Sequence, residues 1–325
     1  MKEYTHNTGT FVGKGGIEIF FQSWTAAKPK AVLVIAHGLG EHSGRYGNII
    51  DRLKGAGISI YALEHRGHGR SGGKRGHIDS FMDYIYDLKL YMNFVKDDNR
   101  KLPLILLGHS LGGLIALKYA LTYPEDMNAL ALSSAAVIPS VEVPAWKSAM
   151  GRFMSKHAPG LLMRSGLDAN DLSHDADVVK AYREDPMVHD RVSARFYTEA
   201  VDTGVECLGR ASELKMPLLI IHGKNDAIVD YRGSEQVFEK ASTPMKAKEI
   251  VVFPDLYHET MNETEKERKQ VLDVVARWII ARVGAKKAPV KKAPAKKAAA
   301  KPAKAAAPAK KAVQPAKKKP PKVKK

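Results

Sequence analysis

The sequence predicts an α/β fold in which helices cover both sides of a mostly parallel sheet. Short apolar runs of strand length alternate with amphipathic stretches of helix length along most of residues 10–283. The run AVLVIAHG at 31–38 is apolar nearly throughout, which is typical of strands that are buried on both faces. Glycine or proline separates many of the successive segments. Such strand–helix alternation favours parallel strands joined by helical crossovers.

The first half of the chain can be divided into elements in order. Residues 10–13 and 17–24 flank a Gly-Lys-Gly-Gly turn, and this pattern predicts a β-hairpin. We expect a helix over 80–98 with Ser80 at its N-cap. The other elements expected here are strands at 31–38, 58–63, 103–110 and 129–134 and helices at 45–54 and 111–122.

The second half repeats this alternation after an interruption. Strands are expected at 217–223 and 248–254 with a helix between them, and a last helix covers 264–283. Residues 137–210 are mostly helical in pattern and contain no strand run, so we expect a helical lid inserted between two core strands. The predicted organisation is core at 1–136, lid at 137–210, core at 211–284 and a basic tail at 285–325. The apolar residues offered by the lid are Val141, Val143, Trp146, Met150, Phe153, Met154, Leu161, Leu162 and Met163.

The positive charge of the chain is concentrated in the tail. The formal net charge is +17, but residues 285–325 hold 16 of the 52 basic residues and no acidic or aromatic residue. Without the tail, 36 basic residues face 35 acidic ones, so the body is almost neutral. The remaining tail residues are almost all Ala and Pro, a composition that predicts disorder and resembles the C-termini of linker histones. Such a tail could bind polyanions, either DNA, RNA or an anionic membrane surface.

Cysteine content and hydropathy indicate the cellular compartment that we expect for the protein. Cys207 is the only cysteine, which excludes an intramolecular disulfide and a multi-cysteine zinc site, and we expect it to be a buried apolar residue. The first residues lack the apolar core of a secretory signal, and no apolar run is long enough to span a bilayer. We therefore expect a cytoplasmic protein.

A nucleophilic serine is predicted at Ser110. Gly108-His109-Ser110-Leu111-Gly112 matches G-x-S-x-G, follows an expected strand directly and opens an expected helix. A sharp turn in this setting lifts the serine hydroxyl away from the sheet, and small flanking residues permit the turn. The backbone N–H of Leu111, at the helix N-terminus, can then donate to a developing oxyanion.

A serine hydroxyl needs a base and an orienting carboxylate, which should follow it in the chain. Asp226 and His258 lie in loops after the strands at 217–223 and 248–254, at the sheet edge where parallel sheets place their ligands. Asp226 is favoured over Asp230 because it lies nearer to the strand end. His222 ends an apolar strand and is favoured as a packed residue, and His109 is expected to point away from Ser110.

The second oxyanion donor is expected in the loop after the strand at 31–38. His37-Gly38-Leu39-Gly40-Glu41-His42-Ser43-Gly44-Arg45-Tyr46 occupies that place, so the N–H of Leu39 is the candidate. The loop lacks the pattern of a phosphate-binding P-loop or a dinucleotide fingerprint.

These motifs together resemble the monoacylglycerol lipase and lysophospholipase group of the α/β-hydrolases. The resemblance covers about residues 10–283 and rests on H-G-L-G-E-H-S-G-R-Y, H-R-G-H-G-R-S, G-H-S-L-G-G, the N-D-x-x-V loop and the Y-H-E loop. It implies an eight-stranded core, a lid, and hydrolysis of single-chain lipid esters without a metal or cofactor. Carried over position by position, it implies Ser110 as nucleophile, Asp226 as orienting acid, His258 as base, and Leu39 and Leu111 as oxyanion donors.

Other functions remain open at this point. Another carboxylester hydrolase or a thioesterase could use the same three residues. A nucleic-acid-binding protein with a vestigial hydrolase body would explain the tail, although the intact set of Ser110, Asp226 and His258 argues against it.

Overall fold

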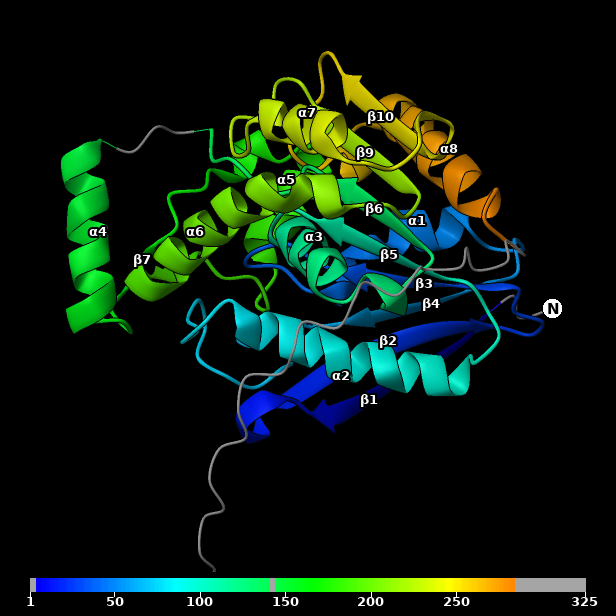
Figure 1. Ribbon diagram of the computed structural model, residues 1–325, viewed down its shortest axis with the longest axis horizontal. Coiled ribbons are helices and arrows are strands. Elements are labelled where there is room, and N and C mark those ends of the chain that lie inside the picture. The colour runs from blue at the N-terminus through cyan, green and yellow to red at the C-terminus, as the bar shows by residue number, and fades with distance from the viewer. Residues whose placement is uncertain (1–3, 141–143, 284–325) are drawn as a thin grey trace, which may run out of the picture. The chain divides into compact units, whose positions relative to one another are not determined.

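The computed structural model describes residues 4–140 and 144–283, and within them a single large sheet organises the fold. The predicted tail at 285–325 lies outside the described residues, as do Val141 and Val143 of the expected lid. The sheet has eight strands in the order β1-β2-β4-β3-β5-β6-β9-β10 (Figure 1). Its strands are β1 (Tyr4–Val12), β2 (Glu18–Ala26), β3 (Ala31–Ala36), β4 (Ile58–Leu63), β5 (Leu104–His109), β6 (Ala129–Ser133), β9 (Leu218–Gly223) and β10 (Lys248–Phe253).

The strand directions confirm the predicted mixture of one hairpin and a parallel sheet. β1 and β2 pair antiparallel, and β2 pairs antiparallel with β4. Every other neighbouring pair, from β4 through β10, is parallel. The order reverses after β3, because β4 lies on one side of it and β5 on the other. At such a reversal the loops diverge and leave a crevice at the carboxyl ends of the strands.

Two separate cores cover the two faces of the sheet. In β3, Val32 and Val34 belong to one core, and Leu33 and Ile35 belong to the other. Successive side chains of a strand point to opposite faces, so a strand that is buried on both faces is apolar at every position. This explains the continuous apolar run at 31–36.

The helices divide between these cores. α1 (Gly47–Arg52) and α8 (Glu265–Ile280) contribute buried side chains to the core around Leu33. The opposite core includes side chains of α2 (Met82–Asp98), α3 (Leu111–Thr122), α6 (Ala194–Arg210) and α7 (Tyr231–Lys240). Cys207 of α6 is fully buried in this core, as predicted, and burial raises the pKa of its thiol to about 12.

The segment between β6 and β9 departs from the prediction in one respect. It contains α4 (Ala145–His157), α5 (Ala176–Glu184) and α6, but also an antiparallel pair of short strands, β7 (Leu162–Arg164) and β8 (Arg191–Ser193). The expectation that this segment has no strand is therefore wrong. Strands of three residues are too short to produce a recognisable alternation. Their pairing also depends on partners 27 to 31 positions away, with Arg164 opposite Arg191 and Leu162 opposite Ser193.

One helix boundary also differs. α2 begins at Met82 rather than at Ser80, and its N-cap position, Phe81, provides no side-chain cap. The Ser80 hydroxyl still accepts a hydrogen bond from the N–H of Met82 at 3.3 Å. The serine thus marks the start of the helix without occupying the cap itself.

The glycines around the serine turn permit a very close approach between α3 and the sheet. A Cβ at Gly112 would lie 2.1 Å from the carbonyl oxygen of Ala36, and a Cβ at Gly108 would lie 2.2 Å from the carbonyl oxygen of Gly112. Both distances are far below van der Waals contact with backbone atoms that have little freedom to move. Only glycine fits at these two positions with the observed backbone.

We therefore expect Gly112→Ala to destabilise the protein by about 1–3 kcal/mol or more, because the added methyl group must displace β3 or α3. Gly209→Ala is the matched control, since Gly209 lies in α6 with no atom within 4 Å of an added Cβ. That change should raise stability by up to about 1 kcal/mol through helix propensity. Urea denaturation of both variants measures the difference, and equal stabilities would contradict the close approach of α3.

Candidate functional site

Ser110 lies in a strained turn between β5 and α3. Its backbone has φ 53° and ψ −119°, a region that costs energy for any residue with a side chain. Three hydrogen bonds hold the turn: the N–H of Ser110 donates to Ser133 O at 2.9 Å, and Ser110 O accepts from the N–H groups of Leu114 and Ala136 at 3.1 and 3.0 Å. The turn projects the serine hydroxyl from the carboxyl end of β5.

The structure brings together the three residues predicted from chain order. The Ser110 Oγ lies 2.9 Å from His258 Nε2, and His258 Nδ1 lies 2.7 Å from Asp226 Oδ2. Asp226 follows β9 and His258 follows β10, so the parallel sheet places both loops beside the turn that carries Ser110. Because Nδ1 donates to a carboxylate, Nε2 of the neutral ring is left to accept the serine proton.

Asp226 is held as a buried anion. Its Oδ1 accepts hydrogen bonds from the N–H groups of Ile228 and Val229 at 2.8 and 2.9 Å, and its Oδ2 lies 3.0 Å from His222 Nε2. Burial opposes the charged form, but the charge of His258 and the hydrogen bonds from His222 and His258 lower the pKa of Asp226 well below its usual range. The carboxylate therefore stays ionised when its histidine is protonated.

The charge of Asp226 also acts on the histidine. Burial lowers the pKa of His258, but the nearby Asp226 carboxylate and its hydrogen bond outweigh burial, so the net shift is upward. A raised pKa makes His258 a stronger proton acceptor for the Ser110 hydroxyl.

The competing residues from the sequence have other partners. Asp230 caps α7 and bonds the N–H and Nε of Arg232, both at 2.9 Å, so it is Asp226 that contacts His258. His222 packs behind Asp226, with Nδ1 2.7 Å from Ser234 Oγ. His109 Nδ1 lies 3.2 Å from Ser133 Oγ, and its ring is 5.0 Å from that of His258.

The candidate oxyanion donors lie at the two loops next to Ser110. Leu111 is the first residue of α3, and Leu39 follows Gly38, where an added Cβ would lie 3.3 Å from Ser110 Cβ. Within the described part of the chain, neither Leu39 N–H nor Leu111 N–H donates a hydrogen bond. An acyl-transfer site requires unused N–H groups of this kind beside its serine hydroxyl.

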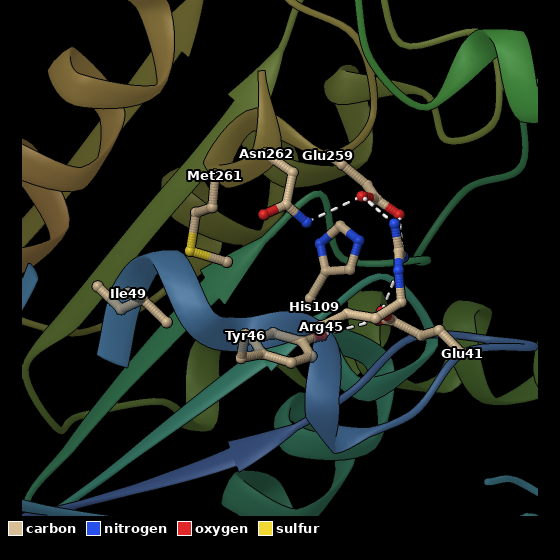
Figure 2. A pocket seen from close by; sticks show the side chains of 8 residues that line it. All are labelled: Glu41, Arg45, Tyr46, Ile49, His109, Glu259, Met261 and Asn262. Carbon is tan, nitrogen blue, oxygen red and sulfur yellow. Dashed lines mark hydrogen bonds and ion pairs between the residues drawn. The ribbon is translucent and has the colours of Figure 1, made fainter. Parts of the chain in front are cut away.

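A charged cluster behind the serine was not assigned a role from the sequence. Glu41, Arg45 and Glu259 line a cavity of about 10 Å³ together with His109, roughly the space that one water molecule needs (Figure 2). The sequence signal for the cluster was the presence of an acidic and a basic residue in the glycine-rich stretch at 37–46. Its third member, Glu259, is 214 positions from Arg45, so their ion pair could not be predicted from the local sequence.

Across 4–140 and 144–283, no three His, Cys, Asp or Glu side chains are grouped in a way that could hold a metal ion. None of the helices in these two ranges has the length and apolar character needed to cross a bilayer.

Comparison with known proteins relates this site to a family. The chain is 38% identical over 285 residues to a monoacylglycerol lipase from Mycolicibacterium smegmatis, covering 87% of this chain and all of that protein. It is 32% identical to the phospholipase YtpA from Bacillus subtilis, over 75% of this chain and 94% of that protein. The crystal structure of a monoacylglycerol lipase from Paleococcus ferrophilus superposes with a TM-score of 0.71 at 32% identity, over 85% of this chain and 99% of that one.

The family match covers the whole site. The serine aminopeptidase S33 family (Hydrolase_4) matches residues 27–265, a range that includes Leu39, Leu111 and all three residues of the Ser110–His258–Asp226 chain. The eight-stranded, mostly parallel sheet agrees with that assignment. The chain therefore belongs to the serine aminopeptidase S33 family of α/β-hydrolases, and it is a serine hydrolase.

Proposed function

We propose that this protein hydrolyses single-chain lipid esters, either monoacylglycerols or lysophospholipids, through an acyl-enzyme on Ser110. The observation that carries the proposal is the hydrogen-bonded chain from Ser110 through His258 to Asp226 at 2.9 and 2.7 Å. Its similarity to a monoacylglycerol lipase and a phospholipase supports a lipid ester as substrate. The alternative, a nucleic-acid-binding protein with a vestigial hydrolase body, is less favoured because the Ser110, His258 and Asp226 side chains are hydrogen-bonded to one another.

The geometry supports a two-step reaction. His258 Nε2 takes the Ser110 proton as Oγ attacks the ester carbonyl carbon, and the carbonyl oxygen becomes an oxyanion that accepts from Leu39 N–H and Leu111 N–H. His258 then gives its proton to the departing alcohol oxygen, which leaves an acyl group on Ser110. In the second step His258 takes a proton from water as the water oxygen attacks the acyl carbon. His258 then gives that proton to Ser110 Oγ, and the fatty acid is released. Asp226 stays ionised throughout and orients His258.

The insertion at 137–210 supports a role as lid. Trp146, Met150 and Phe153 recur at helical spacing on α4 and are 63%, 52% and 60% exposed. Leu161 and Met163, also expected to be part of the lid, are each 48% exposed. These side chains have little packing against the core, so they are available to contact an acyl chain or a lipid surface. We propose that they shelter the acyl chain when substrate is bound.

Replacing the nucleophile should abolish turnover. We expect Ser110→Ala to lower kcat by about 10⁵-fold or more, because no other group can form the acyl-enzyme. A fluorophosphonate probe should label the wild type covalently and leave the variant unlabelled. If Ser110→Ala is still labelled, the nucleophile is a different residue.

The two aspartates near β9 should differ sharply. Asp226→Asn places an amide against His258 Nδ1 and favours the wrong tautomer, so kcat should fall by about 10⁴-fold. Asp230→Asn is the control, because Asp230 bonds Arg232 at the start of α7, and its activity should stay near that of the wild type. Steady-state kinetics on one soluble ester compare them, and equal losses would argue against the orienting role of Asp226.

Chain-length dependence tests the substrate class. Each methylene buried under the lid contributes about 0.8 kcal/mol, so kcat/KM should rise nearly fourfold per methylene until the pocket is filled. The measurement uses p-nitrophenyl esters of graded length, followed by monoacylglycerols and lysophospholipids of the preferred length. A maximum at acetate would favour a small-ester hydrolase, and preference for thioesters would favour a thioesterase.

We also propose that residues 285–325 bind polyanions, on the basis of their 16 lysines and the near neutrality of the body. A protein that ends at Gly284 should keep its activity on a soluble short-chain ester, since no site residue is removed. Full-length protein should bind duplex DNA and anionic vesicles, with a DNA salt slope of about −0.9 per neutralised phosphate. Equally tight DNA binding by the truncated protein would place the basic surface on the body.

A further inference from the structure

A buried triplet of charges joins the two loops on which the proposed reaction depends. Arg45 Nη1 lies 3.0 Å from Glu41 Oε2 and 2.5 Å from Glu259 Oε1, and Arg45 Nη2 donates to Glu259 Oε2 at 2.9 Å (Figure 2). The side chains of Glu41 and Glu259 are only 5% and 4% exposed, and that of Arg45 is 11% exposed. We propose that this Glu41–Arg45–Glu259 cluster is a positioning device that holds the turn carrying Leu39 N–H against the loop carrying His258.

The Glu41 end of the cluster controls the oxyanion turn. Glu41 Oε1 accepts the N–H of Gly38 at 2.6 Å and the hydroxyl of Tyr46 at 2.8 Å. The same carboxylate bonds Arg45 through its other oxygen, so both of its oxygens are committed. The cluster therefore fixes the peptide that precedes Gly38.

The following peptide is fixed from the opposite side. His37 Nδ1 lies 2.8 Å from Gly38 O, and His37 Nε2 accepts the N–H of His65 at 2.9 Å. Since Nε2 is an acceptor, the ring proton is on Nδ1 and is donated to Gly38 O. In a planar trans peptide the C=O and the next N–H point in opposite directions, so this bond also sets the direction of Leu39 N–H. Glu41 and His37 thus hold Gly38 at both of its peptide groups.

The Glu259 end of the cluster controls the base. Glu259 is the residue after His258, and both of its carboxylate oxygens bond the planar guanidinium of Arg45, which restricts rotation as well as position. Its Oε2 also accepts from Asn262 Nδ2 at 2.9 Å. The carbonyl of His258 accepts a hydrogen bond from Ser134 Oγ at 2.7 Å. Release of Glu259 would remove one of the anchors beside the His258 ring.

The cluster also places charge near His258. Burial opposes ionisation of Glu41, but Arg45 and nearby histidines lower its pKa to about 2, so it is an anion. Two carboxylates around one guanidinium leave a net negative charge that raises the pKa of His258, after the larger effects of burial and Asp226. Other titratable groups also face the cluster: Tyr46 donates to Glu41, and the Tyr182 ring lies 4.7 Å from Arg45 Cζ. His109 is a further neighbour, and its pKa is lowered to about 4 by burial and by His258.

This inference rests on the proposed hydrolase function, and Glu259→Gln tests it. The amide keeps the shape of the side chain but loses the charge and one of the two bonds to Arg45. We expect kcat on a soluble short-chain ester to fall by roughly 10- to 100-fold, with KM nearly unchanged, because the reacting groups are misplaced. Loss of a negative charge destabilises protonated His258, so the acid limb of the kcat/KM profile should move to lower pH.

Two companion variants separate charge from geometry. Glu259→Asp keeps the charge but is one methylene too short to reach Arg45 in the same way, so kcat should fall while the acid limb stays near its wild-type position. Arg45→Lys keeps the positive charge but cannot form two parallel bonds, and it should lower kcat with a small effect on KM. This variant preserves the balance of buried charges, so it provides the test if Glu259→Gln does not fold.

Asp273→Asn is the matched control, since Asp273 forms an exposed 2.8 Å pair with Arg52 between α8 and α1. Its kcat and acid limb should equal those of the wild type. Thermal denaturation of every variant reports stability separately. Variants that melt earlier but keep wild-type kcat and an unmoved acid limb would overturn the inference and leave a stabilising role only. A wild type that hydrolyses no ester and resists the fluorophosphonate would overturn the proposed function, and this inference with it.

Discussion

The strained turn at Ser110 is the constraint on which the arrangement of the site depends. A positive φ of 53° is tolerated because β5 and α3 are buried along their length and because hydrogen bonds to Ser133 of β6, Leu114 of α3 and Ala136 hold the turn. The close approach of α3 to β5 needs glycine at Gly108, and its close approach to β3 needs glycine at Gly112, since a Cβ at either position would overlap a backbone oxygen. The same approach places the turn at Gly38 and the N–H of Leu111 next to Ser110. The strained backbone and the close packing therefore both occur at the junction between β5 and α3.

Electrostatics then determine how the assembled groups behave. Asp226 is surrounded by four donors, the N–H groups of Ile228 and Val229 and the rings of His222 and His258, and these offset the cost of burying its charge. The buried Arg45 likewise offsets the cost of burying the charges of Glu41 and Glu259. Both sets of anions favour protonated His258, the state formed when the serine gives up its proton. The site therefore contains fixed negative charge before any substrate binds.

The insertion is attached unequally to the core. Its α5–β8 part is tied to the oxyanion loop: Asp185 Oδ2 lies 2.8 Å from His42 Nε2, and His189 N–H donates to Gly40 O at 2.9 Å. In contrast, α4 packs beside α6, away from the sheet, and keeps its large apolar side chains exposed (Figure 1). The insertion therefore combines one part that is hydrogen-bonded to the loop at 37–46 with another part, α4, that keeps an exposed apolar surface. This division is compatible with the lid role that we propose.

The sequence alone determined the order of strands and helices and the chain order of Ser110, Asp226 and His258. These features depend on neighbours in sequence: a doubly buried strand must be apolar throughout, and a tight strand–helix turn must carry glycines. Only the tertiary structure decided that β7 pairs with β8 and that Arg45 joins Glu41 to Glu259. Each of these depends on which distant loops the sheet brings side by side. The local sequence around a charged loop residue does not identify its ion-pair partner. That partner is determined only when the strands are in register and bring the loops together.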